Sequence, residues 1–567
     1  MKKNLLKILA VAIVGVTMAS CSNPSKMAKD AQLVTVECNP QILEVVANEI
    51  TATYTMNFPE KYFHPRAILE VVPVLVYQGG EVAAPTFKLQ GEKITDNFKP
   101  IYLTGGNASN TVKFAYKPGM EKSHLELRVA VWNKLKKYDF PAPYKLADGA
   151  NITYKLVGTG GASAIAPNEY QKVIREKKET QILYTINSHI VRPKELTKTE
   201  IKEFEDFLIK IENDERRQVK STDIVAYASP DGPLTLNTNL SGKRGETAKQ
   251  AFDKVTKNVS RASSTAITTH TGSVNLATVA PVNVTTVAED WEGFQELVAA
   301  SNIQDKELIL RVLSMYSDPA VREREIKNMS MVFKTLAEKI LPELRRARMI
   351  ANVDYTNYND QELVALASSN VEIMDKEALL YTATLVEDYD TKAMLYKKAG
   401  DKFNSDRGYN NLAAEALSNN KLSDAKVALA KIKDKTSPYY YNNAGVVALR
   451  EEDYVSAAQM FAKSSLEEAK HNSAIIDILN GNYKVAADKL AGSGKGNEGL
   501  AYILTNQLDK ASGVVTRECP RAAYMRAIIA ARKGNMSDVA KHLEAVYKDE
   551  ALKVRSQNDI EFAKFRE

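Results

Sequence analysis

The stretch DIVAYASPDGPLTLNTNLSGKRGETAKQAF, residues 223–252, determines the fold expected for the middle of this chain of 567 residues. Residues 223–228 form a short, largely apolar run that predicts a buried strand. Residues 229–232, Ser-Pro-Asp-Gly, have the composition of a turn. The residues after Leu240 bring alanine and phenylalanine back at helical spacing, so the stretch predicts a strand, a turn and a helix in succession.

The same alternation of strands and helices extends over residues 176–357. A strand is predicted at 181–186, and an amphipathic helix follows, with apolar side chains on one face at positions 201, 204, 207, 208 and 211. Residues 282–287 and 347–354 predict the last two strands, with helical sequence from 289 to about 341 between them. We expect an α/β domain with a helical insertion before its final strand.

The residues around the turn resemble the OmpA-like peptidoglycan-binding domain. Asn237, Leu240 and Arg244 coincide with the asparagine, leucine and arginine of that family's motif. In the family, an aspartate and this arginine hold a diaminopimelate residue of the peptidoglycan stem, and the two charges suit a zwitterionic amino-acid end. The family's aspartate position falls on Ser229, and the nearest carboxylate is Asp231.

This departure leaves two alternatives open, because a serine supplies no negative charge. Either Asp231 substitutes from a reshaped turn, or the pocket no longer binds diaminopimelate strongly. Asp231 also fits a plain turn residue, Arg244 a solvated helix residue, and Asn237 a residue that holds the loop through backbone hydrogen bonds.

The N-terminus has the layout of a secretory signal. Lys2 and Lys3 precede the mostly apolar run 5–16, which is too short to span a bilayer, and small residues lead to Cys21. This arrangement resembles a lipobox, which implies a signal peptide at 1–20 and an acylated Cys21 followed by a tether over 21–32. The tether lacks an acidic run, which favours the periplasmic face of the outer membrane over the cell surface.

Residues 33–156 predict an all-β domain, because apolar and polar residues alternate at 50–56, 112–116 and 125–131. An antiparallel β-sandwich of immunoglobulin-like type is the expected fold. The region resembles an N-terminal domain of unknown function in Bacteroidetes OmpA-like proteins. Residues 157–175 include a run rich in Gly, Ala, Ser and Thr that predicts a flexible linker.

Residues 358–567 predict helices with internal repetition. We expect the second helix of each pair to open at a repeated landmark position, namely at Tyr389, Leu422, Tyr454, Tyr483, Leu508 and Met536. A small or apolar residue follows most of these positions three residues later, which resembles the tetratricopeptide repeat (TPR). A TPR-like α-solenoid implies a concave groove and an unknown protein partner; a non-repetitive helical bundle is the alternative.

Composition limits the function. A net charge of +6 over this length does not suggest nucleic-acid binding. Cys38 and Cys519 are expected to be free and buried, and the six histidines show no metal-ligand spacing, so no metal and no cofactor are expected. No phosphate-binding loop or nucleophile motif occurs, so we expect a protein that is not an enzyme.

Together these features predict a multidomain α+β envelope lipoprotein. In the leading interpretation, lipid at Cys21 holds it to the outer membrane, the OmpA-like block contacts the peptidoglycan peptide stem, and the repeats dock a protein. The alternative is an assembly or adhesion factor, or a secretion-machine accessory, whose OmpA-like domain no longer binds peptidoglycan. A combination of repeats with an OmpA-like domain resembles a component of type IX secretion.

Overall fold

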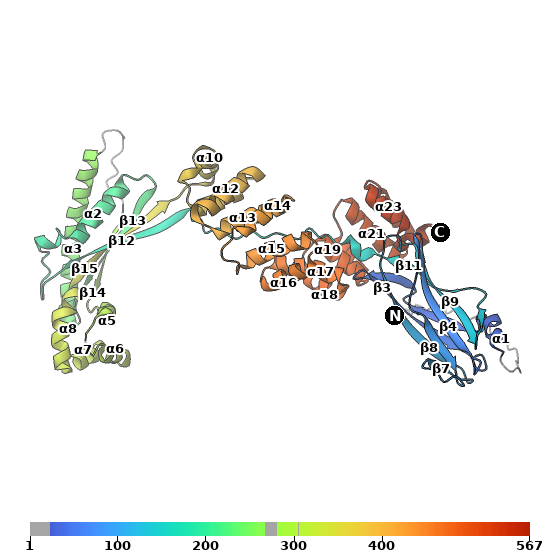
Figure 1. The fold of residues 1–567 in the computed structure, drawn as a ribbon. Helices are drawn as coiled ribbons and strands as arrows, with labels where there is room; N and C mark the ends of the chain where they lie inside the picture. The colour runs from blue at the N-terminus through green and yellow to red at the C-terminus, as the bar shows by residue number, and fades with distance from the viewer. Residues whose placement is uncertain (1–22, 267–279, 304, 567) are drawn as a thin grey trace. The chain divides into compact units, whose positions relative to one another are not determined.

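The computed structural model describes residues 23–266, 280–303 and 305–566 (Figure 1). Two compact units are present: the first joins the chain up to Pro167 with Glu387 onward, and the second is Asn168–Val386. The fold is mixed α/β, with an N-terminal curled β-sheet region and a C-terminal region made of helices alone. The predicted signal peptide and Cys21 lie outside the described residues.

The N-terminal region is an 11-stranded sheet with the main strand order β1-β3-β2-β11-β9-β4-β6-β7, to which β5, β8 and β10 add at its sides. Its strands are β1 (Thr35–Asn39), β2 (Ile42–Val46), β3 (Glu49–Phe58), β4 (Ile68–Tyr77), β5 (Gly80–Ala83), β6 (Phe87–Gly91), β7 (Lys99–Ile101), β8 (Gly106–Ala115), β9 (Ser123–Asn133), β10 (Lys136–Asp139) and β11 (Tyr144–Asn151). The predicted strands 50–56 and 125–131 fall within β3 and β9, and the predicted strand 112–116 overlaps the end of β8. Strand β3 alternates between buried and more exposed residues, as the pattern predicted.

The segment before β1 differs from the tether that we expected. It forms α1 (Pro24–Lys29) and η1 (Ala31–Leu33), and Met27 and Ala31 are buried in the core of the sheet region. The Tyr62 hydroxyl donates to the Met27 carbonyl at 2.6 Å. The part of the tether that is described is therefore fixed to the domain by burial and hydrogen bonding.

The C-terminal helices form successive pairs (Figure 1). They are α12 (Tyr389–Phe403), α13 (Asp406–Ser418), α14 (Leu422–Ala430), α15 (Pro438–Arg450), α16 (Tyr454–Lys463), α17 (Glu467–Leu479), α18 (Tyr483–Leu490), α19 (Gly496–Leu504), α20 (Leu508–Val514), α21 (Pro520–Lys533), α22 (Met536–Val546), α23 (Glu550–Asn558), η5 (Ile560–Phe562) and α24 (Ala563–Arg566). All six landmark residues are the first residues of helices, as predicted.

Residue 358, the predicted start of the helical repeats, lies within the second compact unit. Helices α10 (Asp360–Ser369) and α11 (Lys376–Leu385), with η4 (Val371–Ile373) between them, belong to the second unit. The remaining helices share their unit with the sheet region, and one continuous hydrophobic core contains residues of both, from Leu43 to Phe562. The β region and the end of the helical region therefore belong to one compact unit with a shared hydrophobic core.

The second unit has a four-stranded sheet of order β12-β15-β13-β14, in which only the β13–β14 pair is parallel. Its strands are β12 (Val173–Leu183), β13 (Arg217–Tyr227), β14 (Val282–Val287) and β15 (Arg346–Thr356), and its first two helices are α2 (Thr199–Glu212) and α3 (Leu234–Ala266). Ile201, Phe204 and Leu208 of α2 are buried against the sheet, as predicted from their helical spacing.

The helical insertion before the final strand is confirmed. It comprises α5 (Trp291–Ala300), α6 (Lys306–Met315), α7 (Pro319–Asn328), α8 (Ser330–Lys339) and α9 (Leu341–Leu344). Its apolar side chains form a hydrophobic cluster of their own, with Phe294 and Leu336 inside and Trp291 packed at its edge. The insertion is thus a small helical subdomain that extends from the sheet.

The cysteine prediction is half right. Cys38 and Cys519 are both free. Cys38 is half-buried, but Cys519 is exposed, because it lies at the N-cap of α21 and not on a face that packs against the core.

Candidate functional site

The loop after β13 and the start of α3 bring together all four residues that the OmpA-like resemblance singled out. Ser229 and Asn237 are buried, and the Asn237 amide donates to the backbone carbonyls of Ser229 at 3.1 Å and Gly232 at 2.9 Å. Asn237 therefore holds the Ser229–Gly232 turn in shape, which was one of its two expected roles.

Arg244 is completely buried. This burial fits neither of its two expected roles, a ligand-binding arginine or a solvated helix residue. Its guanidinium donates to three backbone carbonyls: from Nε to Ser188 at 3.0 Å, from Nη1 to Tyr227 at 2.8 Å and from Nη2 to Thr185 at 3.3 Å. Burial lowers the pKa of Arg244 to about 10. The side chain connects α3 to the end of β13 and to the segment after β12, and each of its three nitrogens donates to a backbone carbonyl of the protein itself.

Asp231 also has protein partners. The Ser229 hydroxyl donates to its Oδ1, and Nη2 of Arg345 lies 3.2 Å from its Oδ2. Arg345 lies between α9 and β15, and sequence reasoning did not assign it a role. The charge of Asp231 is therefore balanced by Arg345, while Ser229 supplies a hydroxyl where the family has a carboxylate.

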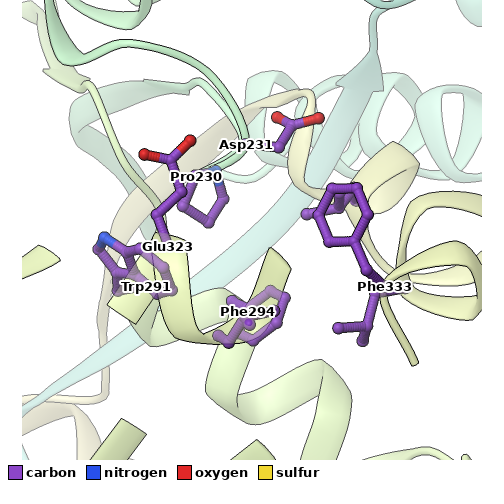
Figure 2. Close-up of a pocket in the computed structure, with 9 residues that line it drawn as sticks. Pro230, Asp231, Trp291, Phe294, Glu323 and Phe333 are labelled. Carbon is purple, nitrogen blue, oxygen red and sulfur yellow. The ribbon is translucent and has the colours of Figure 1, made fainter. Parts of the chain in front are cut away.

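Asp231 lies at a small pocket that is otherwise mostly apolar (Figure 2). The pocket is lined by Pro230, Asp231, Trp291, Phe294, Glu323, Ile326, Phe333, Leu336 and Leu341. Arg244 is not among these residues. A zwitterionic amino acid needs a cation for its carboxylate and an anion for its ammonium. Asp231 lines this pocket but Arg244 does not, so the two side chains do not form a common site for such a ligand.

A second candidate site lies along the helical region, and the segment bound there is the predicted linker. The sequence predicts a flexible segment at residues 158–166, but these residues are held along the first helices of four successive pairs. Four asparagines each accept from the N–H and donate to the carbonyl of one residue of the segment. The pairs are Asn497 with Gly158 (2.8 and 2.9 Å), Asn472 with Ala162 (2.7 and 2.8 Å), Asn443 with Ala164 (2.8 and 2.8 Å) and Asn411 with Ala166 (2.7 and 2.9 Å).

Two further buried asparagines connect this row. Nδ2 of Asn442 donates to the Ala162 carbonyl at 3.0 Å, and Nδ2 of Asn410 donates to the Ala164 carbonyl at 3.3 Å. Side-chain amides also bond one another from helix to helix, Asn472 to Asn442 at 3.0 Å and Asn443 to Asn410 at 3.0 Å. We call the six residues 410, 411, 442, 443, 472 and 497 the asparagine row. Buried amides are costly unless they are bonded, and here the bound backbone supplies their partners.

Arginines fix both ends of the segment. Nε of Arg521 donates to the Leu156 carbonyl at 2.7 Å, and Nη1 of Arg407 donates to the Pro167 carbonyl at 3.0 Å. Burial lowers the pKa of Arg521. Between them, Nε of Arg450 donates to the Gly160 carbonyl at 2.7 Å. The segment is therefore contacted along its whole length by neutral amides and three guanidinium groups.

A sequence signal for this site was present. The Asn-Asn doublets at 410–411 and 442–443 occupy equivalent places in α13 and α15, and Asn472 and Asn497 continue the series in α17 and α19. Asparagine in a helix interior is unfavourable without a special reason, because its side chain competes for backbone hydrogen bonds. Its recurrence on the first helix of four successive pairs is therefore a sequence signal that indicates a polar ligand.

The described residues offer no metal site, since no group of three or more His, Cys, Asp or Glu side chains among them could hold an ion. Within the same part of the chain, no helix is long and apolar enough to cross a membrane. No protein-family model matches the chain, and a search of curated proteins also finds no match.

Proposed function

We propose that the chain is a non-enzymatic envelope lipoprotein, anchored through lipid on Cys21 and facing the periplasm, that works as a protein-docking scaffold. In this proposal the curled sheet is a β-sandwich, the middle unit is OmpA-like, and the C-terminal helices are a TPR-like solenoid. The strand-turn-helix order around Ser229 and the landmark residues at the helix starts support these assignments.

The observation that carries the proposal is the asparagine row. The helical region binds an extended polypeptide through its backbone, and this is a chemistry of docking and not of catalysis. Asn443 and Asn411 contact main-chain atoms of the segment, so the surface is suited to hold peptide. A region with this property in a lipid-anchored protein fits a scaffold for envelope assembly.

The anchor and the scaffold role are tested together in cells. We expect radiolabelled palmitate to enter the wild-type chain and the protein to sediment with membranes, whereas Cys21→Ala is unlabelled and soluble. Affinity-tagged protein, cross-linked in intact cells, should retain specific partners in wild type and lose them in Asn442→Ala/Asn443→Ala. Label on the Cys21→Ala variant, or partners unaffected by the double variant, would contradict the proposal.

Peptidoglycan linkage is a second candidate, because Ser229, Asp231, Asn237 and Arg244 lie around one loop. The complete burial of Arg244 favours the alternative, an assembly, adhesion or secretion accessory without wall binding. Sedimentation with purified sacculi decides between them. Wild-type protein that stays in the supernatant supports the alternative, whereas pelleting that Arg244→Ala abolishes at equal folded fraction supports the wall contact.

A further inference from the structure

The segment bound along the helices shows a strict side-chain pattern. The residues whose backbone is paired with asparagine are Gly158, Ala162, Ala164 and Ala166, and the last two are buried. Ile165, between them, is 44% exposed. In an extended chain, successive side chains and backbone groups point to opposite sides. The asparagines therefore pair with the edge of the segment that carries Gly158 and the three alanines, while on the other edge the Ser163 hydroxyl donates to the Ala414 carbonyl at 3.0 Å.

The space between the segment and the helices limits the size of the side chains that the segment can carry. A Cβ at Gly158 would lie 2.7 Å from Nη1 of Arg521, and one at Gly161 would lie 3.1 Å from a methyl group of Val446. Gly161 also has a positive φ of 64°, which side chains rarely adopt. The positive φ and the close approach of Val446 therefore favour glycine at 161, and the burial of Ala164 and Ala166 leaves little room for larger side chains at those two positions.

We propose that the surface formed by the asparagine row is a binding site for extended peptides that carry Gly or Ala at alternate positions, and that residues 158–166 are its built-in ligand. A partner segment with this pattern enters by displacing them. The inference rests on the proposed docking function and adds the class of ligand and the way in which access is controlled.

The contacts between the built-in ligand and the asparagine row are weak enough for another peptide to replace it. Each hydrogen bond contributes only a small net free energy, because it replaces a bond to water, and the small side chains add little apolar burial. Because the built-in ligand is tethered, it competes at an effective concentration on the order of millimolar. A free peptide should therefore bind weakly to the wild-type chain and much more strongly once the built-in ligand is weakened.

The full-length chain offers a matched pair of variants for this test. Ala164→Pro removes the N–H that donates to Asn443, whereas Ile165→Pro removes an N–H for which the described residues provide no acceptor. The probe is a fluorescein-labelled synthetic peptide of residues 156–168, and its binding is measured by fluorescence polarisation. A second peptide, with leucine in place of the alanines at 162, 164 and 166, tests the size limit.

We expect Ala164→Pro to bind the probe saturably, at least tenfold more tightly than wild type or Ile165→Pro. The leucine peptide should not bind, and adding Asn472→Ala to Ala164→Pro should weaken binding. Absence of binding by folded Ala164→Pro, or equal binding of both peptides, overturns the inference.

Hydrogen exchange on the wild-type chain covers the case in which Ala164→Pro does not fold. Millimolar probe peptide should raise deuterium uptake in residues 157–167, and the leucine peptide should not. Unchanged uptake overturns the inference. If the peptide experiments fail but partner capture in cells still depends on Asn442 and Asn443, the proposed class of ligand is wrong. The proposed docking function would then still stand.

Discussion

Asn443 bonds both backbone polar groups of Ala164, a residue far from it in sequence: its Oδ1 accepts from the N–H and its Nδ2 donates to the carbonyl, each at 2.8 Å. Both residues are buried, so neither water nor another side chain readily replaces these bonds. A helical region and a segment that precedes it by more than two hundred residues are thereby joined through one side chain.

Asn443→Ala should lower the free energy of unfolding of the first unit by about 2–4 kcal/mol, because it leaves a buried N–H and carbonyl of Ala164 without these partners. Urea denaturation followed by circular dichroism measures this loss. Gln459→Ala, which removes an exposed amide from α16, is the control and should stay within about 0.5 kcal/mol of wild type. Equal stabilities of the two variants would mean that the pairing contributes little.

Gly408 in α13 allows α12 to approach closely. A Cβ there would lie 2.6 Å from the Gly400 nitrogen and 2.8 Å from the Tyr396 carbonyl oxygen. Gly408→Ala should therefore destabilise the helical region by roughly 1–3 kcal/mol, because backbone cannot move aside easily.

Gly513 in α20 is the matched control, since nothing lies within 4 Å of a Cβ at that position. Gly513→Ala should be neutral or stabilise the chain by up to about 1 kcal/mol, through the higher helix propensity of alanine. Thermal unfolding of both variants compares them directly, and a stable Gly408→Ala would show that the helices can separate without cost.

Periodicity predicted most elements well, because burial imposes it locally. The landmark tyrosines Tyr389, Tyr454 and Tyr483 begin helices as expected, and β14 coincides with its predicted residues 282–287. What periodicity could not show is which elements share a core. The shared packing of the sheet region with α17–α23 depends on contacts between distant parts of the chain, such as Ile560 against Gly149.

The candidate sites were harder to predict for a related reason. The motif predicts a site around Ser229, but a motif does not say whether an arginine faces solvent or, as Arg244 does, three backbone carbonyls. Residues 158–166 have the composition of a free linker. Their small side chains instead permit close binding, and only the matching asparagines elsewhere in the chain distinguish the two cases.

Acid should weaken the attachment of the chain's C-terminal end to the sheet region. Glu561 bonds Arg532 and accepts from Asn151 and Thr153, each at 2.8 Å. Burial alone would raise the pKa of Glu561, but the hydrogen bonds and charge of Arg532 hold it below its ordinary value. A carboxylate with a lowered folded pKa stabilises at pH above its unfolded pKa of about 4.3, and this contribution is lost as pH falls through the folded value.

Glu561→Gln should therefore lower the thermal midpoint of unfolding at neutral pH. The difference in midpoint between this variant and the wild-type chain should shrink as the pH falls below about 4. The wild-type chain and Glu561→Gln have to be compared at each pH, because burial raises the pKa of nearby Asp559. Asp559 therefore changes the stability with pH in the opposite direction in both proteins. A difference in midpoint that does not change with pH would show that the substitution destabilises the chain through packing or hydrogen-bond geometry and not through the charge of Glu561.

The two thiols should react at different rates. Cys519 is exposed, whereas Cys38 is half-buried and burial raises the pKa of its thiol. Since the thiolate is the reactive form, iodoacetamide should modify Cys519 several-fold faster in a Cys21→Ser background. Peptide mass spectrometry over time measures both sites, and faster modification of Cys38 would contradict its placement in β1.

Arg244→Lys should destabilise the second unit although it keeps the positive charge. A lysine ammonium is a compact donor without the planar fork of arginine, so it cannot reach the carbonyls of Thr185, Ser188 and Tyr227 together. We expect a loss of about 2–4 kcal/mol, in keeping with the charged hydrogen bonds that are removed. The neighbouring Lys243→Ala is the control, because Lys243 is exposed and its removal should cost less than about 0.5 kcal/mol. If Arg244→Lys unfolds like wild type, the guanidinium is not needed inside the unit, and its availability to an external carboxylate has to be reconsidered.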